Sequence, residues 1–209
     1  MQQKRRRRGI VFQGIALSIM DLNTLEKLLR DSVTGIKLCS EAGLVNSALV
    51  LLYSEIDTAG SLDLAYDKQS VRLRYTQWCD AHMFKGTSFD FTSLELYAAR
   101  CGVIHESSVE SDLSREGKAR RIIYAESDIE VDTLREMNRL ARITDYVAVK
   151  FEDLIKAYES GLVEFIKSLR GNEERSRFAL NKANMCLREH PKGEMESLLE
   201  WGKSLLRNR

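Results

Sequence analysis

The chain has 209 residues, of which 44% are hydrophobic, so it is long enough for one ordinary domain with a proper core. Its net charge of +1 excludes attraction of nucleic acid by the molecule as a whole and leaves that role to local basic patches. No apolar run approaches the ~20 residues of a membrane-spanning helix, and four cysteines without a regular spacing suit a reducing compartment, so we expect a cytoplasmic protein with no membrane contact.

The first 20 residues combine a basic arm, Lys4–Arg8, with an apolar segment over residues 9–20. Together they imitate the basic and apolar regions of a signal peptide, but no small-x-small cleavage site precedes a mature start. We expect the arginines to form a flexible arm and the apolar segment to pack on the body, with export as the alternative.

Two apolar helices are predicted next, one from residue 23 or 24 to about 42 and one over about 44–59, followed by a loop at 60–67. The second helix is apolar most of the way round, which indicates a central, buried element. Glu55 and Asp57 continue its apolar rows. Each carboxylate needs a partner there, unless the helix emerges into solvent at that point.

A third helix is predicted over about 69–84 and a fourth over 91–106. Thr92 and Glu95 have the spacing of a capping box, in which each side chain bonds the backbone of the other at a helix start. Residues 107–116 are polar and turn-like, so we expect a loop beside the end of the fourth helix.

The pattern changes in the second half of the chain. Runs of β-branched residues at 121–125 and 146–151 bracket a helix at about 131–142, which predicts a small strand-helix-strand unit, with helices throughout as the alternative. A strongly amphipathic helix follows over 152–170, and Gly171 is the usual signal for its end.

Two further helices are predicted at about 172–189 and 193–207, either as a C-terminal cap or as a hairpin that packs on a partner subunit. The expected fold is mainly α, with a helical bundle, a small strand-helix-strand elaboration and a C-terminal helical region. We divide the chain into the N-terminal arm and apolar segment at 1–20, the bundle at 21–115, and the elaboration with the C-terminal helices at 116–209.

The end of the fourth helix contains the strongest candidates for functional residues. In a regular helix Arg100 and His105 lie roughly 140° apart, and Gly102 between them lowers the cost of unwinding the last turn. The planar guanidinium stays charged and matches phosphate oxygens, and a histidine can move a proton near neutral pH. These residue types point to cleavage of RNA by its own 2′-hydroxyl. The alternative is a histidine without a catalytic role, hydrogen-bonded at the end of a helix.

The spacing Arg100-x-x-x-x-His105 resembles the Arg-x(4–6)-His signature of HEPN domains, and residues 43–59 look like the long second helix of such domains. The resemblance covers about residues 24–106. It implies a metal-independent endoribonuclease in which Arg100 holds the phosphate and His105 acts as acid or base, with two copies meeting at a dimer interface. Cys101 departs from the polar residue that many catalytic members place there, which favours an inactive dimerisation or RNA-binding module as the alternative.

By the same resemblance, the setting would be a toxin or an antiviral defence effector with RNA, a second copy and a cognate antitoxin or defence partner as its contacts, and with no cofactor. Glu55 or Asp57 is expected to orient Arg100 as a supporting group, and Cys101 lies beside it. Local basic residues are candidates for RNA contact, or else solvated faces. They are Arg72, Arg74, Arg115, Lys118, Arg120 and Arg121.

A zinc site is a second interpretation of the same region. Cys79 with His82 and Cys101 with His105 make a formal set of two cysteines and two histidines. Against it, Cys79 and His82 also lie on the apolar face of the third helix, where cysteine is a common buried residue. We predict no metal ligands, and no nucleotide-binding loop or nucleophile elbow is present in the sequence.

Overall fold

The computed structural model describes residues 20–106, 108, 110–125, 129–186, 200 and 203, and over these residues the fold is mainly α, as the sequence predicts. The elements in chain order are α1 (Leu22–Glu41), α2 (Val45–Leu62), η1 (Leu64–Tyr66), α3 (Val71–Trp78), η2 (Cys79–Met83), α4 (Ser93–Cys101), η3 (Gly102–Glu106), α5 (Asp112–Arg115), β1 (Arg121–Ala125), α6 (Val131–Leu140), β2 (Tyr146–Lys150), α7 (Phe151–Arg170) and α8 (Glu173–Cys186). Within the described part of the chain, no helix combines the length and apolarity that a membrane span requires.

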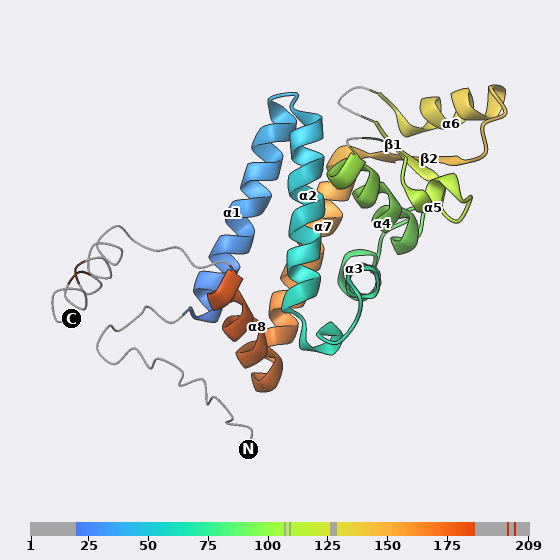
Figure 1. The fold of residues 1–209 in the computed structure, drawn as a ribbon. Coiled ribbons are helices and arrows are strands. Elements are labelled where there is room, and N and C mark those ends of the chain that lie inside the picture. Colours follow the sequence, from blue (N-terminus) through green and yellow to red (C-terminus); the bar gives the residue numbers. More distant parts are fainter. Residues whose placement is uncertain are drawn as a thin grey trace, which may run out of the picture.

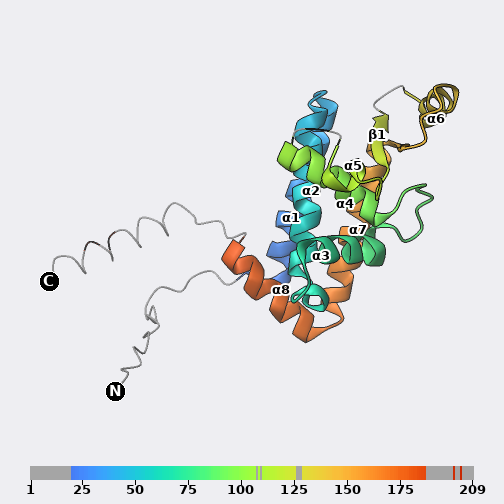
Figure 2. The same ribbon diagram turned by 45° about the vertical axis from the view of Figure 1, so that its right-hand side comes forward.

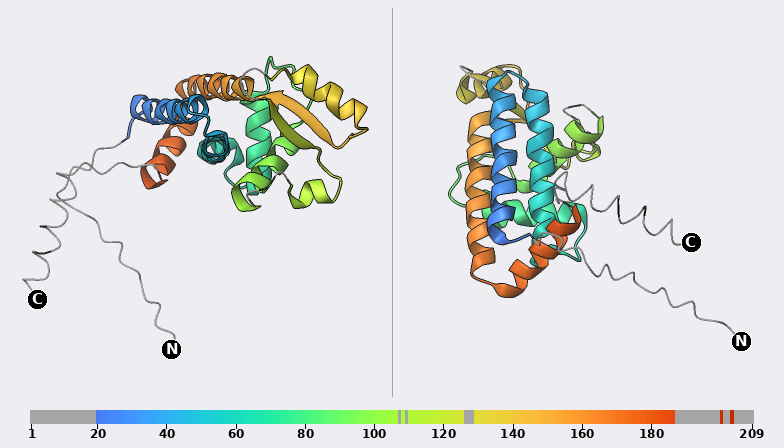
Figure 3. Two further views of the ribbon diagram at one scale, coloured as in Figure 1. Left: turned by 90° about the horizontal axis from the view of Figure 1, so that it is seen from above. Right: turned by 90° about the vertical axis from the view of Figure 1, so that its left-hand side faces the viewer.

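Three long helices form the main body. Figure 3, in its right panel, shows α7, α1 and α2 side by side, and α8 crosses their lower end in Figure 1. Asp21 caps α1 by accepting a hydrogen bond from the amide of Thr24 at 2.7 Å. The first helix therefore begins at Leu22, one or two residues before the predicted start.

The core joins residues from both sides of the division that we placed between residues 115 and 116. Its largest fully buried side chains come from α1, α2, α3 and α7, and one continuous apolar cluster includes them all. Each such side chain contributes roughly 1.5–3 kcal/mol by leaving water. They include Tyr53, Ile56, Tyr75, Trp78, Phe151, Tyr158 and Phe165.

α2 is central, as predicted, but it runs on to Leu62, where a loop was expected from residue 60. Gly60 allows this, because α3 crosses closely there: a Cβ on Gly60 would lie 3.2 Å from the carbonyl oxygen of Arg74. The predicted third helix is split, since the α-helical α3 passes into the π-helical turn η2.

The predicted strand-helix-strand unit is confirmed. β1 and β2 pair in parallel, from Arg121 opposite Tyr146 to Ala125 opposite Lys150, with α6 between them in sequence. Figure 2 shows α6 standing away from the long helices. The unit is joined to the body by a hydrogen bond between the hydroxyls of Tyr124 and Tyr53.

The later helix boundaries also follow the sequence. α7 ends at Arg170, and Gly171 caps it as predicted. The predicted polar loop at 107–116 contains the short helix α5, which Ser111 caps. The predicted basic arm, the apolar segment that follows it up to residue 20 and the predicted helix at 193–207 lie outside the described residues, apart from residues 20, 200 and 203.

Candidate active site

The start of α4 is held by the capping box that the sequence predicts and by one further bond from Arg120. The amide of Glu95 donates to the Thr92 hydroxyl at 3.3 Å, and the amide of Thr92 donates to the Glu95 carboxylate at 2.8 Å. The same carboxylate accepts from Nε of Arg120 at 2.6 Å. These bonds satisfy helix-end amides and fix α4 against the segment before β1.

The end of α4 changes from an α-helix to the π-helical turn η3, which begins at Gly102. The chain then folds back over this glycine: the amide of Ser108 donates to the Gly102 carbonyl at 3.1 Å. A Cβ at Gly102 would lie 2.6 Å from the Ser108 carbonyl oxygen and 2.7 Å from that of Glu110. Glycine is therefore required by the close passage of the backbone.

The π-helical turn brings Arg100 and His105 together. Nη1 of Arg100 lies 2.7 Å from Nε2 of His105, although a regular α-helix would place these side chains on different faces. A guanidinium can only donate hydrogen bonds, so Nε2 of His105 is the acceptor and carries no proton in this contact. The bond thus selects a neutral imidazole with its proton on Nδ1.

Asp57 of α2 anchors the guanidinium from the other side. Its Oδ2 accepts from Nε of Arg100 at 2.8 Å and from Nη2 at 2.5 Å. Three of the five N–H groups of Arg100 are thus used by Asp57 and His105, and a fourth faces Sγ of Cys101 at 4.0 Å.

Burial and charge act in opposite directions on this pair. Burial raises the pKa of Asp57, and the neighbouring Arg100 only partly offsets it. For Arg100, burial lowers the pKa, but Asp57 and Cys101 together raise it by more. The two short N–H···O contacts indicate a charged ion pair.

An open groove of about 630 Å³ runs beside His105, between the starts of α3 and α5 and the end of α4. His105 is exposed and lies on its wall, whereas the Arg100 side chain is 12% exposed and stands behind His105 and Cys101. The residues that line the groove are Ser70, Val71, Arg72, Tyr97, Cys101, His105, Ser111, Asp112 and Leu113.

Of the two carboxylates that were expected to orient Arg100, the structure places Asp57 against it. Glu55 lies toward α1 instead. Burial raises its pKa, and the hydrogen bond with the Ser32 hydroxyl offsets this rise only in part. The two residues are separated by about 200° around a helix, so they serve different neighbours.

The predicted basic residues divide by their partners. Arg72 lines the groove, and Arg74 lies near enough to Asp57 to lower its pKa. The other four contact carboxylates at 2.6–2.7 Å: Arg115 with Asp112, Lys118 with Glu116, Arg120 with Glu95, and Arg121 with Glu110.

The zinc interpretation is not supported by the geometry. Cys79 is fully buried in the core, and His82 lies 3.5 Å from the buried carboxylate of Asp63. Across the part of the chain that the structure describes, no three histidine, cysteine or carboxylate side chains are grouped to hold a metal ion.

The sequence interpretation missed Tyr97 as a residue of this groove. Its ring centroid is 5.9 Å from the guanidinium carbon of Arg100, and its ring meets that of Tyr75 edge-on at 5.5 Å. The signal was present, because Tyr97 and Cys101 are four residues apart and therefore share a helix face.

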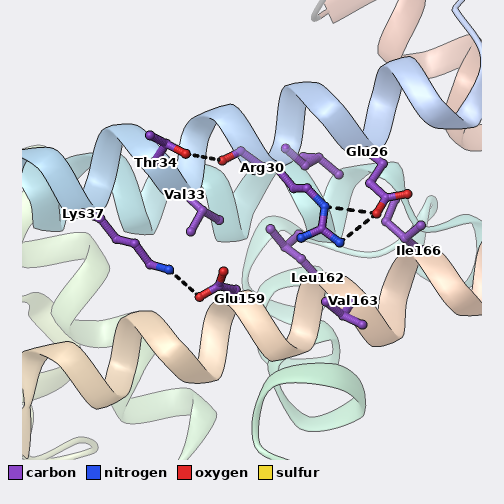
Figure 4. A pocket seen from close by; sticks show the side chains of 10 residues that line it. Glu26, Arg30, Val33, Thr34, Lys37, Glu159, Leu162, Val163 and Ile166 are labelled. Carbon is purple, nitrogen blue, oxygen red and sulfur yellow. Dashed lines mark hydrogen bonds and ion pairs between the residues drawn. The ribbon is translucent and has the colours of Figure 1, made fainter.

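A second cleft, of about 210 Å³, lies between α1 and α7. Figure 4 shows its charged residues paired with one another, Lys37 with Glu159 at 2.6 Å and Arg30 with Glu26 at 2.8 Å. We place the candidate site in the other groove because Arg100 and His105 meet there.

Comparison of the chain with models of protein families, with curated proteins and with solved structures finds no match. The likeness to HEPN domains therefore rests on the residues that carry it.

Proposed function

We propose that this protein is an endoribonuclease that cleaves RNA without a metal, with Arg100 as the phosphate-binding group and His105 as the proton-transfer group. The observation that carries the proposal is the 2.7 Å contact between these two side chains at the wall of an open groove. An arginine fork and an imidazole together supply the charge stabilisation and the proton transfer that such a reaction needs.

In the proposed reaction the 2′-oxygen of the RNA attacks the adjacent phosphorus, and the bond to the 5′-oxygen breaks to leave a 2′,3′-cyclic phosphate. A phosphate oxygen entering the groove competes with His105 for the N–H on Nη1 of Arg100. Exchange of that bond frees the lone pair on Nε2 of His105, which accepts the 2′-hydroxyl proton. Asp57 keeps the guanidinium in place during the exchange.

The departing 5′-oxygen needs a proton from a second group, and we propose that His105 of a second copy donates it. The His105 that donates is in its protonated, imidazolium form, which cannot accept the bond from its own Arg100 and is therefore released from that contact. A homodimer around a two-fold axis would bring both histidines to one cleft. Exposed apolar side chains on α2 and α3 suit such a contact. They are Val50, Val71 and Leu73, each 41–43% exposed; Val71 lines the groove, and Val50 lies two turns before Asp57 on the same face of α2.

The resemblance to HEPN domains agrees with this proposal. It adds to the proposal a biological role, that of a toxin or antiviral defence effector with a cognate partner. This role can be tested once the activity has been measured.

The test is cleavage of a fluorescently labelled RNA with EDTA present. Arg100→Ala and His105→Ala should each lower the rate by about 100-fold or more, because each removes a group that acts in the transition state. Arg139→Ala is the control, since Arg139 pairs with Glu136 on α6 at 2.6 Å, away from the groove. Normal cleavage by both site variants would contradict the assigned roles.

The dimer has its own test. Val50→Asp places a charge in the proposed contact while leaving Arg100 and His105 intact, so light scattering should show a monomer and cleavage should fall with it. A Val50→Asp monomer that cleaves at the rate of the unaltered protein would exclude the shared site.

A second candidate is a non-catalytic RNA-binding or dimerisation module. It is favoured by the way Asp57 and His105 already occupy three donors of Arg100, as they would in a purely structural cluster. RNA binding by a protein that shows no cleavage, with or without these substitutions, would select this candidate.

A further inference from the structure

Among the described residues that line the groove, one charged side chain has no ion-pair partner. The carboxylate of Asp112 on the groove wall is bound by Arg115 at 2.6 Å, and the guanidinium behind the wall is bound by Asp57. Arg72 is exposed on the wall, and among the described residues it has no ion-pair partner. An unpaired guanidinium that faces an open groove is available to an anionic ligand.

An aromatic ring lies where α3 and α4 meet on the same wall. Tyr97 is one turn before Arg100 on α4, and its ring contacts that of Tyr75, which is one turn after Arg72 on α3. The ring of Tyr97 therefore lies in the part of the groove that connects the exposed Arg72 with His105. Nucleotide bases stack on such rings whatever their identity.

We propose that Arg72 and Tyr97 form a second nucleotide subsite in this groove. Arg72 binds the phosphate next to the one that His105 and Arg100 act on, and Tyr97 stacks the base between the two phosphates. The inference rests on the proposed function, because the second subsite is defined by its position next to the reacting phosphate. It adds two positioning residues and a direction for the RNA chain, along the wall from α3 to the end of α4.

The test measures binding apart from cleavage. A labelled 2′-O-methyl hexanucleotide lacks the attacking hydroxyl, so fluorescence anisotropy against salt concentration reports binding alone. Arg72→Ala should weaken binding about tenfold and should reduce the slope of log affinity against log salt by about 0.7, the value for one phosphate contact to a single strand. Tyr97→Leu should weaken binding about tenfold without changing the slope, and Tyr97→Phe should bind normally.

Arg139→Ala is the matched control, because it removes a guanidinium from α6 that is already paired with Glu136. A thermal melt of Tyr97→Leu and Tyr97→Phe separates lost stacking from lost folding. The subsite is overturned if Arg72→Ala keeps the unaltered slope and affinity, if Tyr97→Leu binds normally, or if the unaltered protein binds no oligonucleotide at low salt. Equal binding of heparin with no dependence on Tyr97 also overturns it, because that shows a general polyanion surface.

The same variants separate this inference from the proposed function. Binding that depends on Arg72 and Tyr97 in a protein that does not cleave RNA supports the subsite and contradicts the nuclease. Cleavage that depends on Arg100 and His105 but is normal in Arg72→Ala and Tyr97→Leu supports the nuclease and contradicts the subsite.

Discussion

Asp57 and Arg100 connect the two helices that build the candidate site. One carboxylate oxygen of Asp57, on α2, accepts hydrogen bonds from Nε and Nη2 of Arg100, on α4. The third nitrogen of the guanidinium is left to face His105. The orientation of Arg100 toward the groove is therefore set by a residue 43 positions earlier in the chain.

The first prediction concerns this ion pair. Asp57→Asn should lower RNA cleavage by about 10- to 100-fold, because a guanidinium held less firmly is displaced from the phosphate. Initial rates on labelled RNA measure the effect. Glu55→Gln is the matched control, because Glu55 lies on the same helix but faces Ser32, and it should cleave normally. Equal rates for the two variants would show that Asp57 does not position Arg100.

The second prediction concerns the passage of the backbone over Gly102. Gly102→Ala should destabilise the fold by about 1–3 kcal/mol, since its Cβ would meet two carbonyl oxygens within 2.7 Å. It should also lower cleavage by displacing His105. Gly35→Ala in α1 has open space around the added carbon and should instead stabilise by about 0.5–1 kcal/mol. Urea denaturation compares the two, and a Gly102→Ala protein as stable as Gly35→Ala would refute the argument.

The third prediction is a pH dependence of stability at Glu95. Burial raises the pKa of this carboxyl, but bonds from Arg120 and the Thr92 amide outweigh it, so the pKa is lowered. A lowered pKa in the folded state means stability that is present above the unfolded pKa and is lost as the pH falls through the folded pKa.

Glu95→Gln should therefore cost about 1–2 kcal/mol at neutral pH and much less in acid, as measured by denaturation across the pH range. Glu136→Gln, on the exposed α6, is the control and should leave stability unchanged. The same loss at every pH would show that the charge of Glu95 is not responsible.

The fourth prediction uses Cys101, which lines the groove next to Arg100. Modification by a bulky maleimide should block the groove and stop both cleavage and oligonucleotide binding. Cys101→Ser should keep its activity within about threefold and should resist inhibition, because Cys79 is shielded by the core and the partly exposed Cys39 lies on α1, outside the lining of the groove. Inhibition of Cys101→Ser to the same extent would place the effect at another cysteine.

Much of the fold followed from short-range patterns. The capping box at Thr92 and Glu95 formed as predicted because both partners lie within one turn of the chain. The strands at 121–125 and 146–150 and the end of α7 before Gly171 were also predicted, from β-branched runs and helix periodicity.

Long-range packing decided the details that the pattern could not. The loop predicted at Gly60 is helical because α3 packs closely against the glycine. The choice between Glu55 and Asp57 as the partner of Arg100 depended on how α2 is rotated relative to α4, which local sequence does not specify.

By itself, the sequence determined a mainly helical chain with Arg100 and His105 near the end of one helix. Regular helix geometry would have kept those side chains on separate faces. Only the tertiary structure brought them into contact, because the backbone carbonyls of Ser108 and Glu110 pack over Gly102 and the turn there takes π-helical form. The contact between these two side chains was thus decided by a packing constraint from a later part of the chain, which no spacing within the helix encodes.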